Sequence, residues 1–171
     1  MIRTVNIEND YVNNKDLINL PFEFYNSDKY KSFKFKCFDT VIVMVGASIG
    51  KIGLITSKNI PSLQNQNMWR FRPINSDISP IFIHFYVKHI NKRVKNWSTG
   101  SAREFYKKDF FKKFKCVIPP KEVLNEFNDL SSIYFQQINN NLLEIEKLVR
   151  IRDLMLPKLI NGEIDVSKIE I

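Results

Sequence analysis

The chain has 171 residues, enough for one sizeable hydrophobic core with a small appendage. Its net charge is +8, but residues 1–120 hold 20 Lys and Arg against 9 Asp and Glu, whereas residues 121–171 hold 6 against 9. No apolar run has the length of a membrane span or the position of a signal peptide, and the two cysteines lack metal-ligand spacing. We therefore expect a cytoplasmic protein whose basic part suits nucleic acid, although the same charge also serves solubility.

Residues 1–120 are predicted to form a mixed α+β domain. Strands are expected where β-branched and apolar residues run together or alternate, at residues 2–7, 41–45, 52–56 and 68–71. Residues 80–95 are predicted to form a helix, with proline in its first turn and basic residues near its C-terminus, where cations suit the helix dipole. Residues 114–120, FKCVIPP, are expected to be a last strand closed by two prolines.

The stretch VIVMVGASIGKIG, residues 41–53, first suggests a phosphate-binding loop, because Lys51 follows Gly50. A P-loop needs four residues between its glycines and a hydroxyl residue after the lysine. Here three residues separate Gly46 from Gly50, and Ile52 follows the lysine. The glycine spacing also fails the dinucleotide-binding fingerprint. We therefore predict two buried strands joined by a tight glycine turn, without nucleotide binding.

After the double proline the texture of the sequence changes. From Lys121 to Leu156 there is neither Gly nor Pro, and apolar residues recur every three or four positions. This pattern predicts a helix of about 36 residues, roughly 54 Å long, that ends at Pro157. The apolar stripe contains Phe127, Leu130, Tyr134, Ile138, Leu142, Ile145, Val149 and Leu156, with Arg152 inside it. A stripe of this length favours an antiparallel coiled coil with a second helix, and the alternative is a terminal helix packed on its own domain.

Motifs for catalysis are not found. His84 and His89 lie five residues apart on one predicted helix, so they face different directions, and neither has a metal ligand at a suitable spacing. No Asp or Glu is followed two positions later by Lys, as in many metal-dependent nucleases. Pro119 and Pro120 do not belong to the Asn/Asp-Pro-Pro-aromatic loop of DNA amino-methyltransferases. We therefore expect a non-catalytic chain that binds no metal and no cofactor of its own.

Several polar and basic stretches suit DNA contact instead. Asn and Gln amides can bond adenine edges, and hydroxyl and basic side chains can bond phosphates. If residues 69–72 form a strand, Trp69 and Phe71 face one side and the arginines the other, where they serve either phosphate contact or a solvated face. The candidate DNA-binding residues are Ser48, Lys51, Asn65, Gln66, Asn67, Arg70, Arg72, Thr99, Ser101, Arg103, Lys107 and Lys108.

Four stretches, in this order, resemble the specificity (S) subunit of type I restriction-modification systems. FDTVIVMVGASIGKIG is similar to that family's strand, Gly-Ser/Thr-Ile-Gly-Lys turn and returning strand, and LQNQNMWRFRP to its Asn-Gln-Asn/Asp element. STGSAREFYKKDFFKKFKCVIPP resembles its Thr-Gly-Ser segment, and LMLPKLINGEIDV the end of its conserved helix. The resemblance spans roughly residues 2–166, and the ordered combination is far more specific than any single piece.

The resemblance implies a target-recognition domain, residues 1–120, that binds one half of a bipartite double-stranded DNA target. A spacer helix, residues 121–157, and a C-terminal tail, residues 158–171, follow it. The resemblance also implies that S-adenosylmethionine, ATP and Mg²⁺ belong to methyltransferase (M) and restriction (R) partner subunits, and that no catalysis resides in this chain.

Two departures from the family pattern shape the expected assembly. The family joins two such modules in one chain, and its usual tryptophan-containing opening segment would precede residue 2, so we expect an N-terminally incomplete recognition domain. The chain is then a half-size S subunit or a fragment of a longer one, and it is expected to form a homodimer or to pair with a second S module. The alternative is a DNA-binding and dimerisation module that competes for methyltransferase subunits without a restriction role of its own.

Overall fold

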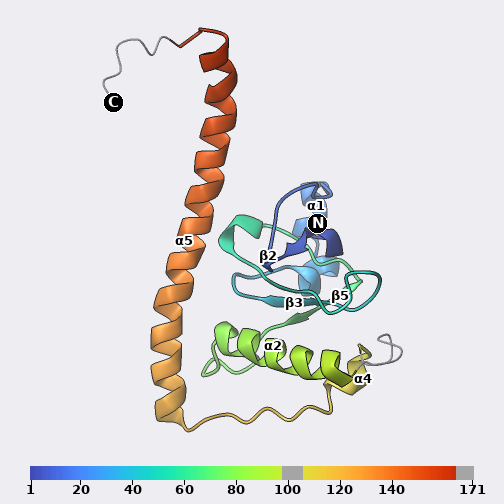
Figure 1. Cartoon of the computed structure of the whole chain (residues 1–171). Coiled ribbons are helices and arrows are strands. Elements are labelled where there is room, and N and C mark those ends of the chain that lie inside the picture. Colours follow the sequence, from blue (N-terminus) through green and yellow to red (C-terminus); the bar gives the residue numbers. More distant parts are fainter. Residues whose placement is uncertain (98–105, 165–171) are drawn as a thin grey trace.

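The computed structural model describes residues 1–97 and 106–164, apart from the side chains of Asn96, Trp97 and Lys108. The described chain consists of a small α+β domain and a long helix, α5 (Lys121–Ile160), which runs beside the domain and extends beyond it (Figure 1). The predicted fold class, a mixed sheet followed by a long C-terminal helix, is therefore confirmed. The coiled coil concerns a second helix, so that part stays a prediction.

One mixed sheet forms the centre of the domain. Its strands are β1 (Ile7–Glu8), β2 (Asp10–Val12), β3 (Thr40–Val43), β4 (Ile52–Leu54) and β5 (Met68–Phe71), in the order β1-β2-β4-β3-β5. All neighbouring strands are antiparallel except β2 and β4, which are parallel. The predicted pair of buried strands joined by a glycine turn is confirmed, because β3 and β4 pair through Ile42 and Ile52.

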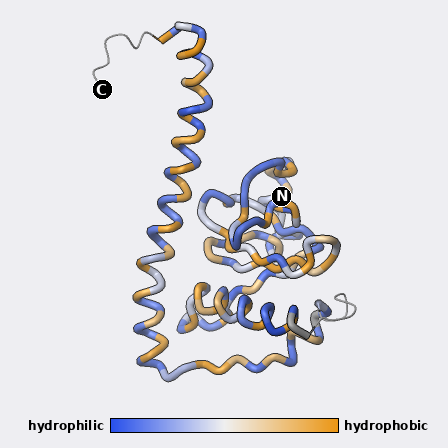
Figure 2. The backbone as a smooth tube through the Cα atoms, in the orientation of Figure 1, coloured by the Kyte–Doolittle hydropathy of each residue, from blue (hydrophilic) through white to orange (hydrophobic). Residues whose placement is uncertain are grey.

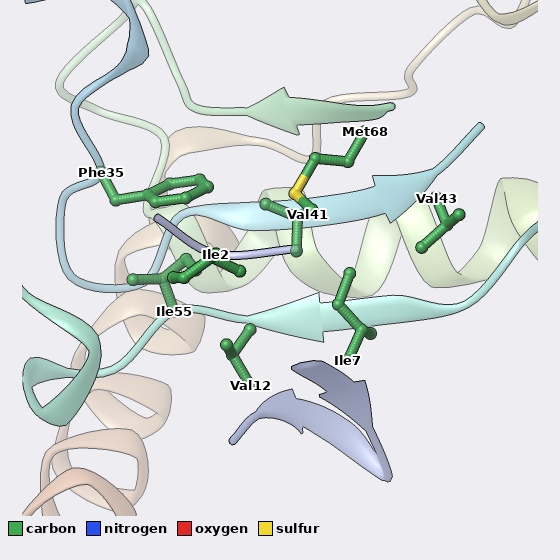
Figure 3. Close-up of a cluster of buried hydrophobic side chains, with 8 residues drawn as sticks. All are labelled: Ile2, Ile7, Val12, Phe35, Val41, Val43, Ile55 and Met68. Carbon is green, nitrogen blue, oxygen red and sulfur yellow. The ribbon is translucent and has the colours of Figure 1, made fainter. Parts of the chain in front are cut away.

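The continuous apolar run in β3 is explained by burial on both faces of the sheet. Successive side chains of a strand point to opposite faces, so a strand covered on both sides needs apolar residues throughout. Val41 and Val43 belong to the cluster that Figure 3 shows, together with Ile2, Ile7, Val12, Phe35, Ile55 and Met68. Ile42 and Met44 pack on the other face, against α2 (Pro80–Trp97) and against Tyr106 and Phe111.

The predicted strand at residues 2–7 is wrong. Residues Thr4–Asn6 form a 3-10 helix, η1, and only Ile7 and Glu8 are in a strand. The side chain of Asn6 turns the chain here: its Oδ1 accepts the Arg3 backbone N–H at 2.9 Å, and its Nδ2 donates to the Lys15 carbonyl at 2.5 Å. Such local side-chain hydrogen bonds compete with a strand ladder.

The predicted strand at residues 114–120 is also wrong, since these residues form neither helix nor strand. The segment runs along the outside of α2 toward the start of α5 (Figure 1). Val117 and Ile118 are 86% and 53% exposed, so this apolar stretch buries no face against the sheet. Short helical segments not predicted from the sequence are α1 (Phe22–Asn26), η2 (Asp28–Phe33), η3 (Ser57–Asn59) and α4 (Lys108–Phe111).

The buried positions of α5 all lie in its first half, and in the second half Glu146 accepts an exposed hydrogen bond from Asn14 at 3.3 Å. Leu124, Ser131 and Asn139 are buried against the domain, whereas residues 143–163 are all exposed. The alternative of a helix packed on its own domain is thus correct for the first half alone. The spacing of apolar residues did not predict this buried face, because two of its positions, Ser131 and Asn139, are polar.

The predicted apolar stripe therefore divides between two environments. Phe127, Ile138 and Leu142 are partly buried, whereas Leu130 and Tyr134 are 59% and 62% exposed. The other three members are exposed: Ile145 lies near the last contact of α5 with the domain, and Val149 and Leu156 lie beyond it.

The predicted end of the helix at Pro157 is wrong, because α5 continues to Ile160. A proline removes one backbone donor, here the one for the Asp153 carbonyl, and at an exposed helix end water can satisfy that carbonyl. Gly162, with a φ of +71°, ends the helix instead, and the Glu163 N–H donates to the Lys158 carbonyl at 2.9 Å.

A contact between Gly50 and Tyr106 ties three segments of the domain together. Gly50 has a φ of +78°, which favours glycine, and the ring of Tyr106 packs directly against it. The Tyr106 hydroxyl donates to Asn91 Oδ1 at 2.6 Å, and Asn91 Nδ2 donates to the Gly50 carbonyl at 2.8 Å. Burial raises the pKa of Tyr106 to about 12, so its hydroxyl remains a donor.

Replacing Gly50 by alanine is expected to destabilise the fold more than replacing Gly46. Both glycines have positive φ, which costs an alanine about 1 kcal/mol. A Cβ on Gly46 would meet nothing within 4 Å, whereas a Cβ on Gly50 would lie 2.8 Å from Tyr106 Cζ. We expect the additional overlap to cost about 1–3 kcal/mol more, measured by urea unfolding. Equal losses for the two variants would contradict this packing.

A second prediction concerns His84, which is buried between the sheet and α5. Its Nδ1 lies 3.2 Å from Thr40 Oγ1, and its ring contacts those of Phe85 and Phe135 edge-on. The pKa of His84 is lowered to about 4, chiefly by burial and also by nearby Lys88, while Asp10 partly opposes the shift.

Because the unfolded histidine titrates near pH 6.5, the unfolded chain binds the extra proton between about pH 6.5 and 4. Stability should therefore fall with acidification through this window, by up to about 3 kcal/mol. Unfolding of the His84→Gln variant should lose this component, whereas His89→Gln, at an exposed position of the same helix, should keep it. Identical pH profiles for wild type and His84→Gln would contradict the assignment.

Candidate nucleic-acid interface

Two clefts flank the turn between β3 and β4. The first, of about 650 Å³, is called the basic cleft here; it lies between the end of this turn, the β1–β2 hairpin and α2. The second, of about 500 Å³, is called the amide cleft; it lies between the start of the turn, the loop before β5, and Tyr106 and Lys107. The lysine side chains of the basic cleft are those of Lys51, Lys88, Lys92 and Lys95, and the exposed amide side chains of the amide cleft are those of Gln66 and Asn67.

The basic cleft has an excess of positive charge. Its four lysines face two carboxylates, Glu8 and Asp10, and Lys88 Nζ pairs with Asp10 Oδ2 at 2.6 Å. Lys51 and Lys92 are exposed, and no carboxylate among the described residues pairs with either of them. Lysines at spacings of four and three residues on a helix share one face, so α2 presents three cations toward the turn. Such a surface suits an anionic ligand.

The amide cleft presents side chains that can donate and accept hydrogen bonds at the same time. Asn65 Oδ1 accepts the Asn67 N–H at 2.8 Å, and the Asn67 carbonyl accepts the Met44 N–H at 3.0 Å, so this loop is held against β3. These bonds occupy the side chain of Asn65 but only the backbone of Asn67, and the side chains of Gln66 and Asn67 are exposed. Trp69 forms one wall, fixed edge-on against Phe111 at 5.5 Å.

Arg70 in β5 and Arg72 directly after it lie on the side opposite Trp69 and Phe71, as predicted, but their guanidinium groups turn inward. Arg72 holds the buried carboxylate of Asp39 in two bonds, from Nε at 2.6 Å and from an Nη at 2.5 Å. Arg70 and Arg72 also donate to the Lys34 carbonyl at 2.9 and 3.1 Å. Burial lowers the pKa of Arg70, as does neighbouring Arg72, while Asp39 raises it.

A buried carboxylate is costly without a cation, so this pairing gives both arginines a structural task. The sequence suggested two roles for these arginines, phosphate contact or a solvated face. Neither role included pairing with a buried carboxylate. Their contact with DNA stays a prediction.

The remaining candidates lie around the same turn or outside the described part of the chain. Ser48 is half-buried within the turn, and its carbonyl accepts the Lys51 N–H at 3.0 Å. Lys107 is exposed beside the amide cleft. Thr99, Ser101 and Arg103 lie outside the described residues, as does the side chain of Lys108.

Sequence reasoning missed the role of the lysines of α2 in lining the basic cleft, because it assigned them to the helix dipole. The signal that identifies them is their spacing, since Lys88, Lys92 and Lys95 fall on one helix face. Within residues 1–97 and 106–164, no three His, Cys, Asp or Glu side chains gather as a metal site. None of the helices in that part of the chain is both long and apolar enough to cross a membrane.

Comparison with known proteins gives this surface a context. Residues 4–151 match the family described as the type I restriction modification DNA specificity domain. The chain is 29% identical over 143 residues to the type I restriction enzyme HindI specificity subunit of Haemophilus influenzae. The aligned region covers 82% of this chain and 29% of that protein. It is 31% identical over 88 residues to the type I restriction enzyme MjaIX specificity subunit of Methanocaldococcus jannaschii, covering 52% of this chain and 20% of that protein.

The chain thus spans less than a third of the length of either relative. The match nevertheless includes the whole sheet, both clefts and most of α5. With 148 of its 171 residues inside the match, the chain belongs to the type I restriction modification DNA specificity domain family.

Proposed function

We propose that this chain is a non-catalytic DNA target-recognition module that binds one half of a bipartite target in a type I restriction-modification system. Family membership supports DNA as the ligand, and the observation that carries the proposal is the pair of clefts around the β3–β4 turn. Motifs of the first, second and third family-like stretches meet there, although they are far apart in sequence. The methyl donor, ATP and Mg²⁺ are assigned to partner subunits.

The two clefts suggest a division of labour. Lysine ammonium groups act as point charges that neutralise phosphates without reading sequence, which suits the basic cleft. Asn and Gln amides can donate and accept together at one base edge, which suits Gln66 and Asn67 in the amide cleft. Since the turn forms a wall of both clefts, a duplex seated over it would place its backbone and base edges on different sides of one short loop.

The basic cleft predicts a specific salt dependence. In the variant with Lys51→Ala and Lys92→Ala, DNA binding should weaken about equally for all sequences. Each lost phosphate contact should reduce the slope of log K against log salt by about one. The control variant carries Lys15→Ala and Lys31→Ala, at two exposed lysines that line neither cleft. Binding measured by fluorescence anisotropy over a salt series checks this, and an unchanged slope would place Lys51 and Lys92 outside the interface.

The part of α5 beyond the domain, residues 147–160, is called the arm here, and we assign to it the assembly of the complex. Figure 2 shows apolar positions recurring along it to its end. Ile145, at its base, and Val149 and Leu156 form one stripe, at 55%, 40% and 50% exposure. A second stripe, about 80° around the helix at 100° per residue, contains Leu148, Met155 and Leu159.

One paired helix needs one stripe, so two stripes suit two different partners. We assign them to a second copy of the chain, or another S module, and to methyltransferase subunits. Pairing of two copies about a two-fold axis would present the same clefts in opposite orientations, so the target would be two inverted half-sites separated by unread base pairs. Pairing with a second module of different sequence would give two unlike half-sites.

The assembly proposal predicts loss of the dimer on charging the first stripe. Replacing Ile145, Val149 and Leu156 by Asp should raise the dimer dissociation constant at least about 100-fold, because buried unpaired charge is costly. Lys147→Asp, about 180° away from the centre of this stripe, is the matched control and should leave pairing intact. Light scattering at micromolar concentration measures the mass. A wild-type chain that stays monomeric alone and with methyltransferase subunits would overturn the symmetric assembly.

A further inference from the structure

Helix α5 contacts the domain at two main levels, and beyond them an exposed, longer hydrogen bond joins Asn14 Nδ2 to Glu146 Oε1 at 3.3 Å. At the lower level, Phe127 and Phe135 of α5 pack edge-on against Phe82 and Phe85 of α2, with ring centroids 5.9–6.2 Å apart. Edge-on aromatic contacts are favourable over a range of centroid distances, so they hold the helix against α2 without requiring one rotation. These contacts alone would therefore allow α5 to tilt relative to the domain.

The buried contact at the upper level is made by one amide, whereas the Asn14–Glu146 bond beyond it is exposed to competition from water. Asn139 is 4% exposed, and its Oδ1 accepts the N–H of Ser57, the first residue of η3, at 2.8 Å. The Cys37 thiol lies 3.8 Å from the same oxygen as a weak donor. A hydrogen bond tolerates far less displacement than an apolar contact, since it weakens steeply with distance and angle. Asn139 therefore fixes both the tilt and the rotation of α5 at this level.

The segment that receives Asn139 is itself braced. Asn59, the last residue of η3, is buried, and its Oδ1 accepts the Thr56 N–H at 2.9 Å. Its Nδ2 donates to the Val12 carbonyl at 3.0 Å and to Asn14 Oδ1 at 2.8 Å, so η3 is tied to the end of β2. The amide of Asn139 thus connects α5 to the sheet through a short, fully bonded turn rather than to a loose loop.

The length of α5 beyond its contacts with α2 turns a small tilt of the helix into a large displacement of its end. Ile160 lies 25 residues beyond Phe135, about 37 Å along the helix. A tilt of about 10° about the aromatic level would move the end of the arm by roughly 6 Å, close to two base-pair steps of 3.4 Å. A small angular freedom at α5 therefore becomes an uncertainty of whole base pairs between two modules joined through their arms.

We propose that Asn139 is a positioning residue that fixes the direction in which α5 leaves the domain, and thereby the spacing between the two half-sites of an assembled pair. The first part concerns the free chain, and the second rests on the proposed function.

The variants are chosen to separate the hydrogen bond from packing. Asn139→Ala removes the acceptor and leaves a small void, whereas Asn139→Leu fills the volume but also lacks the acceptor. Asn139→Asp keeps an acceptor oxygen for the Ser57 N–H; its buried carboxyl group should lower stability, but the orientation of α5 should remain that of the wild type. Asn140→Ala is the matched control, because it is the same change at the next position of the helix, where the side chain is exposed.

Residual dipolar couplings of the free chain test the first part. In the wild type, Asn139→Asp and Asn140→Ala, one alignment tensor should fit the sheet and α5 together. In Asn139→Ala and Asn139→Leu, the amide shifts of the sheet should be retained away from η3, while α5 should need a separate tensor or show reduced couplings. A single common tensor in both of these variants would overturn the positioning role, because α5 would then be held without the Asn139 acceptor.

Selection from duplexes with variable spacers tests the second part. The wild-type chain, assembled with its methyltransferase partner, should enrich one spacer length, and Asn139→Ala and Asn139→Leu should enrich lengths broadened by about two base pairs around it. The half-site sequence should be unchanged in all variants. An unchanged single spacing in these two variants would overturn the claim about spacing. A wild type that enriches no half-site at all would instead contradict the proposed function and leave the tensor result standing.

Discussion

The close approach of Tyr106 to the backbone of Gly50 is the contact on which the rest of the binding surface depends. It leaves no room for a side chain at the glycine, and Asn91 joins the two residues by hydrogen bonds on both sides. One small cluster thus fixes the β3–β4 turn, the middle of α2 and the point where the chain returns at residue 106. The turn lines both clefts, α2 lines the basic cleft, and Tyr106 lines the amide cleft, so this cluster fixes one part of each cleft relative to the other. Gly50, in a motif that looks like a nucleotide-binding loop, therefore has a packing role.

The two halves of the long helix have different environments, and the assembly role is proposed for the second half alone. Its first half is a structural part of the domain, held by aromatic rings and by one buried amide. In its second half, Glu146 accepts a hydrogen bond from the side chain of Asn14, and residues 143–160 are exposed, with apolar side chains on two stripes. The spacing of apolar residues alone therefore does not show which face of the helix is buried. The buried face contains the polar residues Ser131 and Asn139, whereas many apolar residues of the second half are exposed in the isolated chain. The direction of the free half is set by the contacts of the attached half.

Much of the fold could be predicted from local patterns. Strand β5 and the start of α2 lie where alternation and proline placed them, and the buried run of β3 was recognised from its β-branched residues. The failures have particular causes. Asn6 turns the chain where apolar residues suggested a strand, and residues 114–120 do not join the sheet but run on toward the start of α5. Both outcomes depend on partners elsewhere in the fold, which no local window contains.

The candidate site was predicted in part. Lys51, Gln66, Asn67 and Lys107 do lie around one turn, and family-like motifs had indicated these segments. The inward turn of Arg70 and Arg72 was not foreseeable, because their partner Asp39 is more than 30 residues away and its burial follows from the tertiary structure. Lys88 and Lys92 were visible as helix residues, but their meeting with the turn depends on how α2 crosses the sheet.

The most direct test of the central claim is selection of bound sequences from a randomised duplex library, comparing the wild type with the Gln66→Ala and Asn67→Ala double variant. If the amide cleft reads bases, the wild type will enrich one short motif. The double variant will lose preference at particular positions of that motif while retaining overall affinity from the lysines. Enrichment of the same motif with undiminished preference by the double variant, or of no motif by the wild type, would contradict the account.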